Sequence, residues 1–148
     1  AFANAFLGLN HSIAHKLGGA FGFPHGLCIS IAMLPVIKFN GASGNVKRTP
    51  YPRYEVYRAQ KDYADIARSL CLPGKSDAEL VDSLCKRIRE LMKACDIEPS
   101  LSANGVSKEA FDAALPAMID RVYDDQCTVQ NPRQPSMAEI KQLLLSMY

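Results

Sequence analysis

Apolar side chains recur along this chain at the three- and four-residue spacing that predicts α-helices. The first helix is predicted over residues 1–17; it is apolar nearly all round, which favours burial on most sides, and the glycine pair 18–19 should end it. A second apolar helix is predicted over residues 24–39, bent or broken at Pro35. Since the first helix starts without a capping side chain, we expect further chain before Ala1.

The rest of the chain predicts shorter, amphipathic helices separated by turn-forming residues. A loop rich in Gly and Pro covers residues 41–53, and helices are expected over 54–70, 76–95, 107–124 (interrupted near Pro116) and 136–147. The Ser-x-x-Glu patterns at 76–79 and 136–139 are capping boxes. No segment shows the alternation of a strand, so we predict an all-α fold of about six helices in one domain.

Two of these amphipathic helices have a predicted buried face. The faces comprise Tyr63, Ile66, Ala67 and Leu70 on the first, and Leu80, Leu84, Ile88, Leu91 and Cys95 on the second. Both sets follow the spacing of a single helical stripe, which is expected to face the core.

Composition narrows the class of protein. The chain has 148 residues, 48% of them hydrophobic and 22% charged, and a net charge of +2, values typical of a globular domain with no electrostatic case for a nucleic-acid or membrane partner. No run is long enough for a transmembrane helix, and no signal peptide is recognisable. The five cysteines are odd in number and form no CxxC pair, which favours free thiols in a reducing cytoplasm over a zinc ribbon or a disulfide framework.

The candidate chemistry lies in three histidines, His11, His15 and His25, which are the only ones in the chain. His11 and His15 are four residues apart on one helix face, a spacing found in metal sites, but spacing alone leaves open which two would share an ion. Roles as core or capping histidines stay open as well. A metal usually takes about four ligands, and no acidic residue occurs before Glu55, so a complete metal site within this chain is not expected.

Motifs at both ends of the chain point to a family. They are HSxAHxLG from His11, PHG from Pro24, DDQCT from Asp124, NPR from Asn131 and ExKQxL from Glu139. Together they resemble the iron-containing alcohol dehydrogenase family, and in particular the alcohol dehydrogenase part of bifunctional aldehyde–alcohol dehydrogenases. The motifs occur in order and cover nearly the whole chain.

The resemblance implies a domain and its partners. Residues 1–148 would be the C-terminal helical, metal-binding domain of a two-domain enzyme, with a dehydroquinate synthase-like helical bundle. The N-terminal α/β domain of that enzyme, which is absent here, would bind most of the NAD. It implies Fe²⁺, with Zn²⁺ as the other ion that histidines accept. The substrates would be a primary alcohol and its aldehyde, and the parent enzyme would be a cytoplasmic homo-oligomer.

The resemblance also assigns roles to residues. His11 and His25 match metal ligands, whereas His15 matches an active-site histidine beside substrate and nicotinamide, and is the candidate catalytic residue. Phe2 and Cys127 match positions that line the substrate pocket. Two alternatives stay open: a zinc-dependent polyol dehydrogenase of the same superfamily, and a non-catalytic helical interaction module.

We expect the 148-residue chain to be inactive on its own. It contains no glycine-rich phosphate loop after a strand, and it offers only half of the metal ligands that the resemblance implies. The check is an assay of the isolated chain with alcohol, NAD and Fe²⁺. NADH formation above the background of a metal-free control would contradict the expectation.

Overall fold

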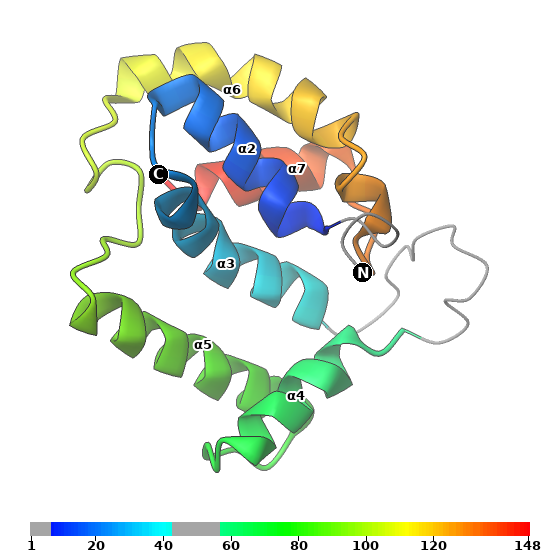
Figure 1. The fold of residues 1–148 in the computed structure, drawn as a ribbon. Helices are drawn as coiled ribbons and strands as arrows, with labels where there is room; N and C mark the ends of the chain where they lie inside the picture. Colours follow the sequence, from blue (N-terminus) through cyan, green and yellow to red (C-terminus); the bar gives the residue numbers. More distant parts are fainter. Residues whose placement is uncertain (1–6, 43–56) are drawn as a thin grey trace.

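The computed structural model describes residues 7–42 and 57–148, and these ranges contain helices and no β-strand (Figure 1). The elements are α2 (Leu9–Phe21), α3 (His25–Gly41), α4 (Ala59–Ser69), α5 (Asp77–Ala94), α6 (Lys108–Tyr123), the 3-10 turn η1 (Thr128–Gln130) and α7 (Met137–Leu145). The all-α prediction is confirmed. In the described ranges, none of the helices has the length and apolar character to cross a membrane.

Helix α3 lies at the centre and packs on two sides (Figure 1). One side of it faces α2, α6 and α7 and contributes Cys28, Ile31, Ala32, Val36 and Phe39 to the main core. Its other side contributes Leu34 and Ile37 to a smaller cluster with α5. A helix that is apolar all round is stable when it is covered on both sides, and α3 has this position.

Several predicted helix boundaries are wrong. Helix α2 continues through the glycine pair 18–19 to Phe21 and ends at Gly22, whose φ of 70° is left-handed. Pro35 and Pro116 do not break their helices, because both lie inside continuous α-helices. A proline inside a helix costs about 3 kcal/mol, and the buried side chains on either side of each proline offset that cost.

Serine caps start three of the helices. Ser136 and Glu139 form the full predicted capping box of α7. In α5, Ser76 accepts from the Glu79 amide, but the Glu79 carboxylate accepts from the amide of Lys75 rather than of Ser76. The two Ser-x-x-Glu patterns therefore differ in the amide that the glutamate accepts: the serine's own amide in α7, and the amide one residue earlier in α5.

The predicted buried faces of α4 and α5 are partly wrong. Ile66 on α4 and Leu70, which directly follows α4, are 49% and 56% exposed, and Leu91 on α5 is 48% exposed. Cys95, also expected in the stripe, follows the end of α5 and is exposed. The predicted residues Ala67, Leu80 and Leu84 are buried and pack with Ala64, and Tyr63 and Ile88 lie half-buried against them. The contact between the two helices is therefore narrower than the predicted faces.

A buried pair of side-chain amides joins three parts of the fold. Asn131 Nδ2 donates to Asn40 Oδ1 at 2.7 Å, and Asn40 Nδ2 donates to Asn131 Oδ1 at 3.1 Å. The same Asn131 oxygen accepts the Leu9 amide at the start of α2, at 3.3 Å. The first helix therefore receives its cap from a residue 122 positions away, which is why no local capping side chain is needed.

Arg133, in the loop between η1 and α7, binds the end of α3. Its guanidinium lies 3.9 Å above the Phe39 ring and donates to the Phe39 carbonyl at 2.8 Å. It also donates to the Glu139 carboxylate at 2.6 Å. Arg133 thereby connects the end of α3 to the capping box that starts α7.

We expect Asn131→Ala to lower the free energy of unfolding by about 3 kcal/mol, because it removes both bonds between the two buried amides and leaves the Leu9 N–H without its partner. The Asn40 amide then keeps only its long contact of 3.5 Å with the Tyr63 hydroxyl. Urea unfolding measures the change. Asn104→Ala is the matched control: that amide is only half-buried and bonds two loop carbonyls, so the loss should stay near 1 kcal/mol. Equal losses in the two variants would contradict a special role for Asn131.

Substitution of Gly19, inside α2, and of Gly22, at its end, by alanine should change the stability of the chain in opposite directions. Gly22→Ala should destabilise the chain by about 1 kcal/mol because of its left-handed backbone. Gly19→Ala should stabilise it by roughly 0.5–1 kcal/mol, since Gly19 is helical and an added Cβ would meet nothing within 4 Å. Thermal unfolding of both variants checks the signs, and the same sign for both would refute this reading of the turn.

Candidate metal and substrate site

The turn between α2 and α3 brings the three histidine rings together. The ring centroids of His11 and His25 are 5.4 Å apart, as are those of His15 and His25, and those of His11 and His15 are 6.1 Å apart. His11 and His15 come from successive turns of α2, whereas His25 is the first residue of α3. Three histidines that are close in the sequence are therefore close in space as well.

The histidines lie on an open face of the bundle. His15 and His25 are exposed and His11 is half-buried. Burial, with repulsion from His25 and His15 in addition, lowers the pKa of His11 below its usual value. The neutral imidazole that results is the form that binds a metal. The face of α2 that carries the histidines is thus its open side, while Leu9, Ile13, Ala14 and Leu17 on its other sides are buried.

The ring spacing fits a shared ion for two of the rings. A ligating imidazole nitrogen lies ~2.1 Å from a bound zinc ion, which puts two ring centroids on one ion roughly 5–6 Å apart. Each ligand ring also has the ion in its own plane. The same 5.4 Å separates the His11 and His25 rings and the His15 and His25 rings, so the spacing suits either pair. The imidazole donors therefore fit a divalent ion, and the geometry leaves the choice of pair open.

The remaining ligands of such a site are not found among residues 7–42 and 57–148. Over these ranges, no group of three or more His, Cys, Asp or Glu side chains is arranged to hold a metal ion. The described residues thus offer a pair of imidazoles on an open face, and a complete site needs donors from elsewhere.

His11 and His15 form one stripe along α2, and a second stripe beside it contacts the C-terminal loop, residues 124–136 between α6 and α7. Ser12 Oγ, fully buried, lies 2.9 Å from Thr128 Oγ1, and the Thr128 hydroxyl lies 2.6 Å from the Val122 carbonyl. One turn further, the Lys16 ammonium forms an ion pair with the Asp125 carboxylate. Each of these α2 residues directly follows a histidine, so the two stripes are separated by roughly 100° around the helix.

Cys127 lies in this loop and is buried, with 5% exposure. Its amide donates to Asp125 Oδ1 at 2.7 Å. Burial, and then the neighbouring Asp125 carboxylate, raise the pKa of its thiol. The other predicted pocket residue, Phe2, lies outside the described residues, so its role stays a prediction.

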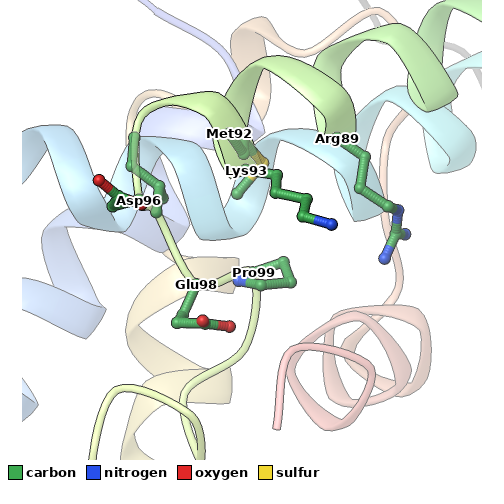
Figure 2. Close-up of a pocket in the computed structure, with 7 residues that line it drawn as sticks. Arg89, Met92, Lys93, Asp96, Glu98 and Pro99 are labelled. Carbon is green, nitrogen blue, oxygen red and sulfur yellow. The ribbon is translucent and has the colours of Figure 1, made fainter.

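One surface recess includes a histidine, and a larger one lies elsewhere on the molecule. His15 and Lys16 line a recess of about 160 Å³ between α2 and α6, with alanines and Met118 on the α6 side. A larger recess of about 450 Å³ lies at the end of α5; Figure 2 shows Arg89 and Lys93 extending from that helix above Glu98 and Pro99. The larger recess shares no residue with the histidine cluster, so its size does not mark it as the site.

Sequence reasoning missed the residues that hold the site in place. Ser12 and Lys16 stand inside the histidine motif, and Asp125 and Asn131 stand inside the C-terminal motifs, yet none was singled out for a role. One signal was available: polar residues at one-turn spacing beside the histidines, on a helix otherwise apolar.

Comparison with known proteins gives a consistent result. The family described as "Fe-containing alcohol dehydrogenase family, C-terminal" matches residues 1–148. The chain is 40% identical to an aldehyde-alcohol dehydrogenase of Clostridium acetobutylicum, over all of this chain and 17% of that protein. It is 36% identical to the NADPH-dependent butanol dehydrogenase of Clostridium saccharobutylicum, over all of this chain and 34% of that one.

A solved structure shares the fold. It is described as 1,3-propanediol oxidoreductase and superposes with a TM-score of 0.77 at 25% identity, over all of this chain and 34% of that one. The chain thus spans between about a sixth and a third of the length of these proteins. Because the family match extends over every residue, the chain belongs to the iron-containing alcohol dehydrogenase family, in its C-terminal region.

Proposed function

We propose that this chain is part of a metal-dependent alcohol dehydrogenase that interconverts a primary alcohol and an aldehyde with NAD(H). The observation that carries the proposal is the approach of the His11 and His25 rings to 5.4 Å on an open face, in a chain of this family. The rest of the metal shell and most of the nucleotide site would come from further chain, since the relatives are three to six times longer.

In this proposal His11 and His25 hold a divalent iron. When bound, the ion and the nicotinamide supply the reaction's Lewis-acid charge stabilisation and its hydride acceptor. The lowered pKa of His11 supports this role because protonation would compete with the metal. Histidine ligands accept zinc as well, so the ion is settled by metal analysis of enzyme purified without oxygen.

His15 is the proposed catalytic residue of this chain. It is exposed, lies beside both proposed ligands and lines the recess between α2 and α6. From there its imidazole can accept the proton that the alcohol releases and pass it to water, which is a common role for an exposed histidine near neutral pH. Cys127 would line the substrate side of the site.

We expect His11→Ala and His25→Ala, made in the full-length enzyme, to abolish metal retention. His15→Ala should retain metal near one ion per site and lose turnover by about 10²-fold. His15→Ala is the matched control for metal binding, since it removes an imidazole from the same cluster, one that is exposed as His25 is. Metal content by elemental analysis and initial rates with NAD and NADP are the measurements.

Two results would contradict these roles. Loss of metal from His15→Ala would make this histidine a ligand instead of a catalytic residue. Full metal content in His11→Ala and His25→Ala would remove the proposed metal site from this chain. Circular dichroism of each variant verifies that the helices persist, which is expected because no histidine belongs to the buried core of the described residues.

A further inference from the structure

The ion pair between Lys16 and Asp125 lies at the junction of the two parts of the proposed site. Lys16 follows His15 on α2, and Asp125 stands two residues before Cys127 in the C-terminal loop. Both side chains are largely buried, at 18% and 12% exposure. By contrast, the ion pairs within α4, α5 and α6 join side chains that are 44–64% exposed. Ion pairs this exposed contribute little.

The Asp125 carboxylate makes two different contacts. Oδ2 pairs with the Lys16 ammonium, and Oδ1 accepts the amide of Cys127 at 2.7 Å. The carboxylate therefore links the helix that carries the histidines directly to the backbone at Cys127. Since Thr128 contacts Ser12 one turn earlier on α2, the loop has a second fixed point and cannot swing freely about the first.

From this geometry we propose that Lys16 and Asp125 are positioning residues for substrate binding: their ion pair fixes the backbone at Cys127 relative to the histidine face of α2, and so sets the affinity for the alcohol. The proposal rests on the proposed function, because it takes Cys127 as a wall of the substrate pocket. Neither residue need touch the substrate, and neither takes part in bond making.

Two substitutions at Asp125 separate its contacts. Asp125→Asn keeps an oxygen for the Cys127 amide and removes the ion pair, whereas Asp125→Ala removes both. In the full-length enzyme, we expect Asp125→Asn to raise the KM for the alcohol about tenfold while kcat changes less than about threefold. Asp125→Ala should raise KM further, and Lys16→Arg should stay near the wild type.

Thiol reactivity distinguishes positioning from general loosening of the fold. The Asp125 carboxylate raises the pKa of Cys127 and the Lys16 ammonium lowers it. Alkylation of Cys127 by iodoacetamide at fixed pH, followed by peptide mass spectrometry, should therefore become faster in Asp125→Asn and slower in Lys16→Met. A loosened loop would make it faster in both. Glu90→Gln, which removes an exposed ion pair on α5, is the control and should change neither KM nor alkylation.

Each outcome decides a different point. Raised KM with opposite alkylation effects supports the proposal. An active enzyme in which Asp125→Asn leaves KM unchanged overturns the positioning role alone. Faster alkylation in both single variants, with a parallel fall in Tm, overturns it in favour of a purely structural ion pair. A metal-loaded wild-type enzyme that does not oxidise alcohols overturns the proposed function itself, and the alkylation measurement still reports on the ion pair without any turnover.

Discussion

The arrangement of the histidine-bearing helices depends on the buried amide pair of Asn40 and Asn131. Each amide donates to the other and accepts from it, and both side chains are buried. In a low-dielectric interior such a pair is strong when complete and costly when one partner is missing. Since it also caps the start of α2 and lies at the end of α3, it holds together the two helices on which the candidate site is built.

The fold places its chemistry at one end of its most buried element. Helix α3 is covered on both sides, yet its first residue, His25, lies exposed where the turn from α2 arrives. The left-handed Gly22 makes this turn short, and the same end of the molecule therefore presents His11, His15 and His25 together. A rigid interior and an exposed ligand cluster come from the same pair of helices.

Local patterns predicted the helices, the serine caps and the all-α class, because periodicity and capping are properties of neighbouring residues. They failed where a distant contact decides the outcome. Pro35 predicts a bend or a break, but α3 is covered on both sides and does not break there. Leu91 reads as core, but the neighbouring Met92 is the residue that packs against α3, and Leu91 stays 48% exposed. The Asn131 side chain that caps Leu9 is 122 residues away, so no local sequence pattern around either residue predicts the bond.

The main core of the described residues closes without a single imidazole. In small zinc domains the metal supplies much of the folding free energy, so the unloaded chain is unfolded. Here the helices pack through aliphatic and aromatic side chains, and the rings of His11 and His25 lie outside that packing. Under the proposed function, the ion would therefore bind a chain whose helices are already packed, and binding would add stability to that fold without creating it. A cell short of the metal would then hold a folded chain that can be loaded later.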